Sequence, residues 1–547
     1  MRRLGPCASC LLLAALVWTT AAASLHYQFV YDDVAVVVER QPFWEEGLGS
    51  FFTSRHWVTG RQATLASLDL DRLWNDPGAL AFHRTNVVLA TLVALLVWVL
   101  ATRISLSPQG ALVAAALFAV HPVHVDAVVA VVGRAELLAA LGVLTALVLS
   151  IRAPARSTGS AARPLPESGA AKAGRCLLIF GAALVAVFAK ESAACLALLL
   201  LASRWALGPR VRLAAPLAAA GAALALWVVV ATPSLGVAMT PEFVDNPLAH
   251  APALERIPKA LALLGSYLRL TLWPHPLLLD RCYAQTDPSL ISGYAAVIGW
   301  AAYCCVALAL RRRSAAAALA LVWFPIAFAF TANVVVPIGT IMAERLLFLP
   351  SLGPCLLAGV VVDEARNRGR LERTVATGLA AAIVAIYVPL FLERGAAWAS
   401  AEVYFPASTA ASPRSAKAWY DLGQWLSTRR STPGSALEAE AAWRRALEIL
   451  PDFHRANYEL AESLGRRGQP LAGAEVYERF LKLVPDDTGA LTNITRLLLE
   501  ARQPERANAY AQRLISLEPD NEAARETLVL TESMMHKAQR GAPSVSP

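Results

Sequence analysis

Residues 84–102 read Arg84-Thr-Asn-Val-Val-Leu-Ala-Thr-Leu-Val-Ala-Leu-Leu-Val-Trp-Val-Leu-Ala-Thr102, and no residue after Arg84 in this run carries a charge. A helix of this length spans most of the hydrocarbon core of a bilayer. The run therefore predicts a transmembrane helix, and the fold class depends on how often such runs recur.

Apolar runs of this kind recur along most of the chain. Of the 547 residues, 56% are hydrophobic and 16% are charged, which exceeds what one soluble core would use. Together with the run above and the apolar run after Met1, the following stretches give about eleven predicted transmembrane helices, some short or tilted: 109–121, 135–151, 176–190, 193–207, 211–231, 291–310, 314–332, 346–362 and 374–392. Residues 1–395 are thus predicted to form an all-α polytopic membrane domain.

Basic clusters predict the orientation of these helices. When the runs are threaded in order, the clusters fall on the cytoplasmic side, as the positive-inside tendency requires: Arg103, 152–175, 204–212, 311–313 and 366–373. Segments 25–82 and 232–290 then lie on the outer side, provided that 258–273, with Lys259 and Arg269, is an interfacial helix on that face rather than another crossing. The same distribution explains the net charge of +8 without a nucleic-acid partner.

The N-terminus fits two interpretations. Met1-Arg-Arg, an apolar run and Ala21-Ala-Ala-Ser24 suit either a cleaved secretory signal or a retained membrane anchor. Both alternatives export the segment that follows. The eight cysteines show no disulfide or zinc spacing, and Cys282 is the one clear loop cysteine.

The C-terminal part of the chain contains a repeat. Pro451-Asp452, Pro485-Asp486 and Pro519-Asp520 recur every 34 residues, the period of the tetratricopeptide repeat. The sequence therefore predicts a linker over 396–415, then three repeats plus a C-terminal helix over 416–537, and a disordered tail over 538–547. Such repeats stack as an α-solenoid whose concave face usually holds a peptide or another protein.

Polar side chains gather at the outer ends of the predicted spans. Two adjacent carboxylates, Asp32 and Asp33, follow the first span, where ionised groups beside lipid are costly and suggest a function. The other outer-face groups mix cations with carboxylates: Arg61, His83, Asn86, His121, His124, Asp126, Arg134, Glu136, Lys190, Glu191, Glu344 and Arg345. A carboxylate can take a proton from an acceptor hydroxyl, and cations can neutralise a phosphate leaving group. The set suits glycosyl transfer from a lipid-phosphate sugar.

Each of these groups also has a structural interpretation. An aspartate after a span can cap a helix by accepting hydrogen bonds from free backbone N–H groups. The pairs Lys190-Glu191 and Glu344-Arg345 can be local ion pairs. His121, His124 and Asp126 lack a fixed set of ligands, so hydrogen-bonded structural roles are favoured over a metal site.

With these motifs in view, the chain resembles the transmembrane and tetratricopeptide-repeat (TMTC-like) protein O-mannosyltransferases and their bacterial relatives, within the GT-C class of polytopic glycosyltransferases. The resemblance covers nearly the whole chain and is carried by these landmarks: Tyr31-Asp-Asp33, Phe82-His-Arg-Thr-Asn86, His121-Pro-Val-His-Val-Asp-Ala127, Gly133-Arg-Ala-Glu136, Ala189-Lys-Glu-Ser192, Asp245-Asn-Pro247, Leu272-Trp-Pro-His-Pro-Leu-Leu-Leu-Asp280 and Pro337-Ile-Gly-Thr-Ile-Met-Ala-Glu-Arg-Leu-Leu-Phe-Leu-Pro-Ser351. Two positions depart from the family pattern: Arg61-Gln-Ala-Thr64 replaces the usual Arg-Pro-Leu-Thr, and Ala90 replaces a histidine.

The resemblance implies an inverting transfer, without metal or other cofactor, of a sugar from a polyprenyl phosphate to a Ser or Thr hydroxyl of an exported protein. The sugar is mannose in the eukaryotic members. Asp32 or Asp33 would be the general base. The expected donor-phosphate contacts are Arg61, His83, Arg134, Lys190 and Arg345, and the expected supporting polar groups are His121, Asp126, Glu136, Glu191 and Glu344. The repeats would bind the acceptor or a protein partner.

Two other functions remain open from the sequence: a non-catalytic membrane scaffold that uses the repeats for protein binding, and a transporter of lipid-linked sugars. The polar residues gather at one face rather than along an intramembrane pathway, which disfavours alternating access. The alanine- and arginine-rich composition favours a bacterial inner membrane with periplasmic repeats, and the endoplasmic-reticulum membrane with luminal repeats is the alternative.

Overall fold

The protein is helical throughout the part that the structure describes. The computed structural model describes residues 5–42, 45, 60–73, 78–154, 168–235, 240–429 and 434–541. Within these ranges, extended pairing is limited to one antiparallel bridge between Ile151 and Val211. The chain divides into a membrane unit, residues 1–279 and 286–407, and a repeat unit, residues 280–285 and 408–547.

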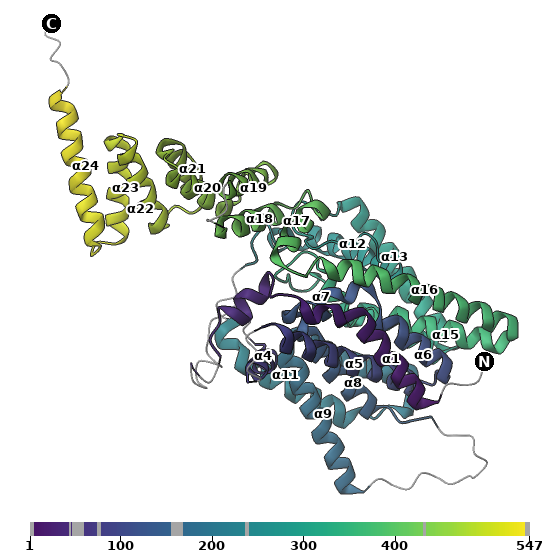
Figure 1. Cartoon of the computed structure of the whole chain (residues 1–547). Helices are drawn as coiled ribbons and strands as arrows, with labels where there is room; N and C mark the ends of the chain where they lie inside the picture. The colour runs from purple at the N-terminus through teal and green to yellow at the C-terminus, as the bar shows by residue number, and fades with distance from the viewer. Residues whose placement is uncertain are drawn as a thin grey trace. The chain divides into compact units, whose positions relative to one another are not determined.

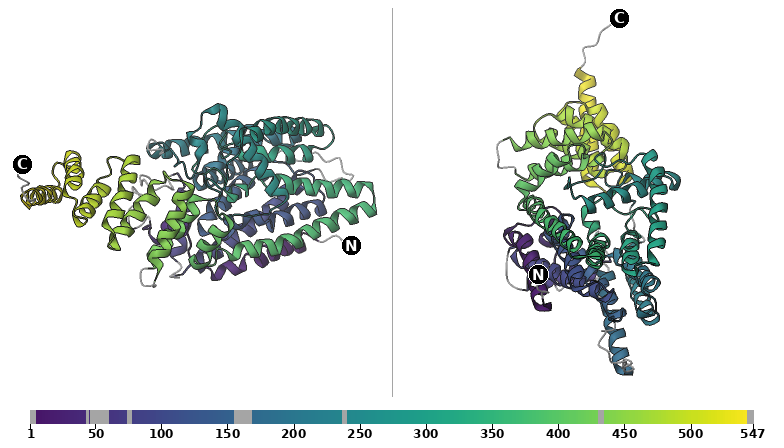
Figure 2. Two further views of the ribbon diagram at one scale, coloured as in Figure 1. Left: turned by 90° about the horizontal axis from the view of Figure 1, so that it is seen from above. Right: turned by 90° about the vertical axis from the view of Figure 1, so that its right-hand side faces the viewer.

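The membrane unit is a bundle of mostly long helices (Figure 1). Its helices are α1 Pro6–Ala21, α4 Gln62–Arg72, α5 Leu80–Arg103, α6 Pro108–Ala119, α7 Val125–Val128, α8 Arg134–Ser150, α9 Gly169–Ala189, α10 Leu196–Leu207, α11 Ala214–Leu235, α12 Ala253–Leu272, α13 Leu290–Arg311, α14 Ala315–Phe328, α15 Leu352–Arg368, α16 Arg370–Ala396 and α17 Ala401–Ala411. Figure 2 shows α16 beside α1, so this unit brings together helices from its two ends.

The helices confirm the polytopic class that the sequence predicts. Among the described residues, eight helical segments are long and apolar enough to cross a membrane, and α6 with residues 122–128, bent by 51°, makes a ninth. α14 is a shorter apolar helix. The run predicted at 346–362 is shifted: residues Glu344–Leu347 form a 3-10 turn, and α15 begins only at Leu352 and continues into charged residues.

The segment 258–273 lies within α12, which is not among the candidate spans. One side of α12 is buried through Ala260, Leu263 and Tyr267, whereas Arg269 is exposed. This division into an apolar and a polar side is typical of an interfacial helix. The interfacial placement stays a prediction that this amphipathic pattern supports.

Two glycines allow α6 and α15 to pack closely. A Cβ atom on Gly359 would lie 2.5 Å from the carbonyl oxygen of Gly110, and a Cβ atom on Gly110 would lie 2.7 Å from that of Gly359. Asp363 of α15 also accepts hydrogen bonds from the backbone N–H, at 2.7 Å, and the hydroxyl of Ser107, the N-cap of α6. Close helix approach through small residues is a common means of packing in membranes.

We therefore expect Gly359→Ala to destabilise the membrane unit by about 1–3 kcal/mol, because the added methyl group meets backbone rather than a movable side chain. Thermal unfolding in detergent should show a lower midpoint than in the wild type. Gly378→Ala, in α16, is the matched control because a Cβ atom there meets nothing within 4 Å. Equal midpoints for the two variants would contradict the packing argument.

The repeat unit is a series of helices that follow one another in chain order (Figure 1). They are α18 Ala416–Thr428, α19 Ser435–Ile449, α20 His454–Arg466, α21 Pro470–Leu483, α22 Thr488–Glu500, α23 Pro504–Leu517 and α24 Glu522–Gly541. Successive pairs form three hairpins with α24 after them, as the period of 34 residues predicts. Gly468 takes the positive φ of +73° at the turn between α20 and α21, a conformation that glycine adopts without steric cost.

The boundary between the two units differs from the predicted one in two ways. The predicted linker 396–415 contains α17, because Ala401–Ala411 forms a helix. Residues 280–285 of the predicted outer segment belong to the repeat unit. There, the carboxylate of Asp280 accepts a hydrogen bond of 2.5 Å from the hydroxyl of Ser415, and Cys282 is a free loop cysteine, as predicted, whose side chain is buried.

Candidate functional site

Asp33 is fully buried and is held by backbone donors. Its carboxylate accepts hydrogen bonds from the N–H groups of Val132, at 2.8 Å, and Val131, at 3.2 Å. These residues form the turn directly before α8. Asp33 therefore fastens the segment after α1 to that turn. It is the N-cap residue of the short helix Val34–Val38 but makes no side-chain cap hydrogen bond there, so its role is a long-range tie and not the cap of the next helix.

The environment of Asp33 changes its acidity. Burial raises its pKa to about 7, although the N–H groups of Val132 and Val131 lower the pKa and the charge of Asp32 raises it. In the unfolded chain this carboxyl has its ordinary pKa of 3.8. Between about pH 4 and pH 7 the folded protein therefore keeps a proton on Asp33 that the unfolded chain has released.

It follows that stability falls as the pH rises from about 4 to about 7, because the folded state binds more protons than the unfolded state in this window. Asp33→Asn should remove this part of the pH dependence of the unfolding midpoint in detergent. Glu39→Gln, at an exposed carboxylate nearby, should keep it. An unchanged pH profile in the Asp33 variant would show that Asp33 does not titrate in this range.

Asp32 faces a different environment, a small cavity of about 60 Å³. The cavity is lined by Asp32, Val36, Arg61, Thr64, Leu68, Asp126, Ala130, Val132, Gly133, Ala135, Glu136, Lys190, Arg345 and Trp398. These residues come from the segment after α1, from α4 and its N-cap, from the 126–136 region, from the turns after α9 and before α15, and from the turn after α16. The fold thus brings six of the twelve predicted site residues to one cavity, namely Asp32, Arg61, Asp126, Glu136, Lys190 and Arg345.

Two of the three cations in the cavity are paired with carboxylates. The Nη2 atom of Arg61 lies 2.7 Å from Oε1 of Glu191, and its Nε atom lies 3.1 Å from Oε2. Lys190 pairs with Glu136. Such fork-like arginine contacts and buried pairs hold side chains in fixed positions.

Arg345 differs from these two cations. Among the described residues, it has no hydrogen bond or ion pair from its side chain, and Asp32 has none either. Burial lowers the pKa of Arg345, but the nearby charges of Asp32 and Asp126 raise it by more, so the guanidinium stays charged. The cavity therefore combines an unpaired carboxylate with an unpaired cation.

Other predicted phosphate contacts lie outside the cavity. Arg134 is completely buried and is occupied by Asp71, at 2.6 Å, and by the Asn86 side chain and the Phe82 and Ser67 carbonyls, at 2.8, 2.8 and 2.9 Å. These partners join α4, α5 and α8, so the arrangement is that of a structural tie. His83 is also buried, with its ring edge-on to Tyr27.

The histidines of the His121 motif are likewise engaged with protein groups. Nε2 of His121 lies 2.9 Å from the carbonyl oxygen of Thr271, and Nε2 of His124 lies 2.7 Å from the hydroxyl of Ser351. Both rings are buried. Their contacts fit the hydrogen-bonded structural role that the sequence favoured.

The sequence prediction missed Arg394 and Trp398 at the end of α16. Trp398 lines the cavity, and its indole N–H donates to Oδ1 of Asp126 at 3.2 Å. Nη2 of Arg394 donates to the same oxygen at 3.0 Å and lies 3.6 Å from Oε2 of Glu344. One pattern could have revealed Arg394: it is a cation at the predicted outer end of the last span, against the positive-inside tendency.

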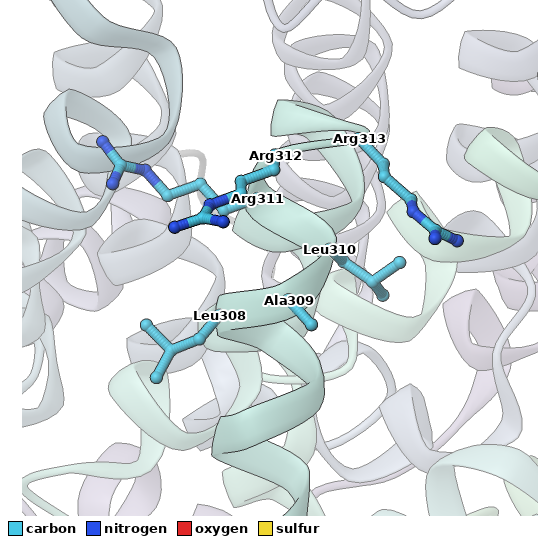
Figure 3. A pocket seen from close by; sticks show the side chains of 6 residues that line it. All are labelled: Leu308, Ala309, Leu310, Arg311, Arg312 and Arg313. Atoms are coloured by element: carbon cyan, nitrogen blue, oxygen red, sulfur yellow. The ribbon is translucent and has the colours of Figure 1, made fainter.

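A larger cavity of about 730 Å³ lies at the C-terminal end of α13 and is lined by Leu308–Arg313 (Figure 3). The side chains of Arg311 and Arg313 point to opposite sides in this view. Arg311 donates to the carbonyl oxygen of Trp205 at 3.0 Å and stacks over its ring. Among the residues that the structure describes, no carboxylate lines this cavity, so the described lining offers no base for sugar transfer to a hydroxyl.

Known proteins resemble this chain along most of its length. No protein-family model matches it. Protein O-mannosyl-transferase TMTC3 from Mus musculus is 24% identical over 497 residues, which cover 83% of this chain and 51% of that relative. The chain is thus similar to TMTC3 over most of its own length. These relatives confirm the family resemblance drawn from the motifs.

Two further comparisons complete this picture. Protein O-mannosyl-transferase TMTC1 from Mus musculus is 32% identical over 152 residues, 25% of this chain and 16% of that relative. The archaeal oligosaccharyltransferase AglB from Archaeoglobus fulgidus aligns with 80% of this chain and 59% of its own, with 13% identity and a TM-score of 0.39. This chain spans about half the length of TMTC3.

Proposed function

We propose that this chain transfers a sugar from a polyprenyl-phosphate donor to a Ser or Thr hydroxyl of an exported protein. The names of its relatives make mannose the first sugar to test. The observation that carries the proposal is the cavity around Asp32 and Arg345. Among the described residues, these are the two ionised side chains of the cavity that have neither a hydrogen bond nor an ion pair. An acid–base group and a cation that are both unengaged are available to a substrate.

In the proposed reaction, Asp32 removes the proton of the acceptor hydroxyl as its oxygen bonds to the anomeric carbon of the sugar. The bond from that carbon to the phosphate oxygen breaks, and the electron pair leaves with the polyprenyl phosphate. Arg345 stabilises the charge on the departing phosphate. Attack opposite the leaving group inverts the anomeric carbon, and the chain's own cations supply the positive charge, so no metal is part of the proposal.

The repeat unit is proposed to bind the acceptor protein or a partner, as helical repeats commonly do. We also propose that the repeat unit lies on the outer side of the membrane, in the periplasm of a bacterium or in the lumen of the endoplasmic reticulum; the orientation predicted from the basic clusters supports this proposal.

The direct test uses the purified full chain in detergent with a polyprenyl-phosphate mannose donor and Ser/Thr-containing acceptor peptides. Mass spectrometry should find one added hexose on Ser or Thr. Proteins from cells that contain or lack the chain should show the same difference. If the folded chain neither transfers nor hydrolyses the donor sugar, and no hexose differs between the cells, the proposal fails and a scaffold role is favoured.

A further inference from the structure

Arg394 contacts two carboxylates near Arg345: Asp126, whose charge acts on Arg345, and Glu344, which precedes Arg345 in the chain. Nη2 of Arg394 lies 3.0 Å from Oδ1 of Asp126 and 3.6 Å from Oε2 of Glu344. It also donates to the carbonyl oxygen of Leu278 at 2.9 Å, while Oε1 of Glu344 accepts from the Leu278 N–H at 2.7 Å. All three charged side chains are at most 10% exposed, so their interactions are only weakly screened by water.

Arg345 lies within reach of the same charges. It follows Glu344 in the chain, and Asp126 is among the strongest charges acting on it. Both Asp126 and Arg345 line the cavity. If Arg394 were absent, the buried carboxylate of Asp126 would lose this cation, and Arg345, which lines the same cavity, is a nearby cation able to replace it, because an unpaired buried charge is costly.

We propose that Arg394 is a positioning residue that occupies Asp126 and Glu344 and thereby leaves Arg345 unpaired for the phosphate of the donor. This inference rests on the proposed function. Arg394 is not proposed to contact the substrate. It acts through two carboxylates, and its effect is to prevent them from capturing the phosphate-binding cation.

A purely structural role of Arg394 predicts a different result from a positioning role. If Arg394 only stabilised the fold, Arg394→Gln would lower the unfolding midpoint but would leave the dissociation constant of the folded protein for polyprenyl phosphate unchanged. If Arg394 protects Arg345, Arg394→Gln weakens phosphate binding, and neutralising Asp126 removes the carboxylate that the loss of Arg394 has freed and should restore that binding. The dissociation constant of polyprenyl phosphate, measured on the folded single and double variants, therefore separates a structural role from a positioning role.

The test measures the dissociation constant of polyprenyl phosphate for the purified full chain in detergent. Arg394→Gln should raise this constant by about tenfold, the effect of losing one hydrogen bond to a charged group. Adding Asp126→Asn to Arg394→Gln should bring the constant back to within about threefold of the wild type. Glu393→Gln, at the exposed neighbouring position, should leave it unchanged.

The proposal is overturned if Arg394→Gln binds polyprenyl phosphate as tightly as the wild type, or if the double variant binds no more tightly than the single one. Should Arg394→Gln fail to fold, Arg394→Lys provides the same comparison, since a lysine has one compact charge for two carboxylates. Its weaker binding should again be restored by Asp126→Asn, and a failure of that restoration overturns the proposal.

The same measurements distinguish a failure of this inference from a failure of the proposed function. A wild-type chain that binds polyprenyl phosphate but transfers no sugar contradicts the proposed function and leaves this inference standing. A wild-type chain that transfers sugar, with Arg394→Gln unaffected in phosphate binding, contradicts only the inference. A wild-type chain that does not bind polyprenyl phosphate contradicts both.

Discussion

Asp32→Asn is expected to lower the rate of sugar transfer by about 10²- to 10⁴-fold, the usual contribution of a general base. Asparagine has nearly the same shape as aspartate but cannot take the proton of the acceptor hydroxyl. The loss should appear in kcat, because Asp32 is proposed to act on the acceptor hydroxyl rather than on the donor phosphate. Binding of polyprenyl phosphate should therefore change little.

Asp33→Asn is the matched control for this prediction because it makes the same chemical change one residue away. The Asp33 carboxylate is buried and engaged with the N–H groups of Val131 and Val132, and it does not line the cavity. Its variant should lose stability but keep transfer per folded molecule. Full activity of folded Asp32→Asn, or a complete loss in folded Asp33→Asn, would contradict the assignment of Asp32 as the base.

The two aspartates illustrate how far the sequence alone could lead. An acidic pair after the first span was recognisable from its residues and from the family resemblance. Which carboxylate is engaged structurally depends on donors at Val131 and Val132, about a hundred positions further along the chain. No local pattern contains that information, since it arises only when the outer loop packs against the turn before α8.

The roles of the four predicted cations were likewise not predictable from the sequence. Arg61, Arg134, Lys190 and Arg345 look alike in the sequence, because each flanks a predicted span on the same side. They differ in how their charge is used: Arg134 joins three helices, whereas Arg345 has no side-chain partner among the described residues. By contrast, the spans and the repeats were predictable because they follow from apolar runs and a fixed period.

Arg345→Gln is expected to weaken the binding of polyprenyl phosphate by about 10- to 100-fold, because it removes a charge-assisted hydrogen bond in a poorly hydrated cavity. Arg345→Lys should lose less, since it keeps the charge but not the planar fork that can hold two phosphate oxygens. The dissociation constant of the purified chain in detergent measures both effects. Arg269→Gln, which removes an exposed cation from α12, should bind as the wild type does.

The Arg61→Gln variant tests whether Arg345, rather than the paired cation Arg61, binds the donor phosphate. Arg61 is already held by two contacts to Glu191, so a phosphate must compete with that carboxylate for it. Removing Arg61 also releases Glu191, but this side chain is 39% exposed and the charge of Lys190 also acts on it, so the fold should tolerate the change. If Arg61→Gln weakens phosphate binding more than Arg345→Gln in folded protein, the donor phosphate is held by the paired cation, and the assignment of Arg345 is wrong.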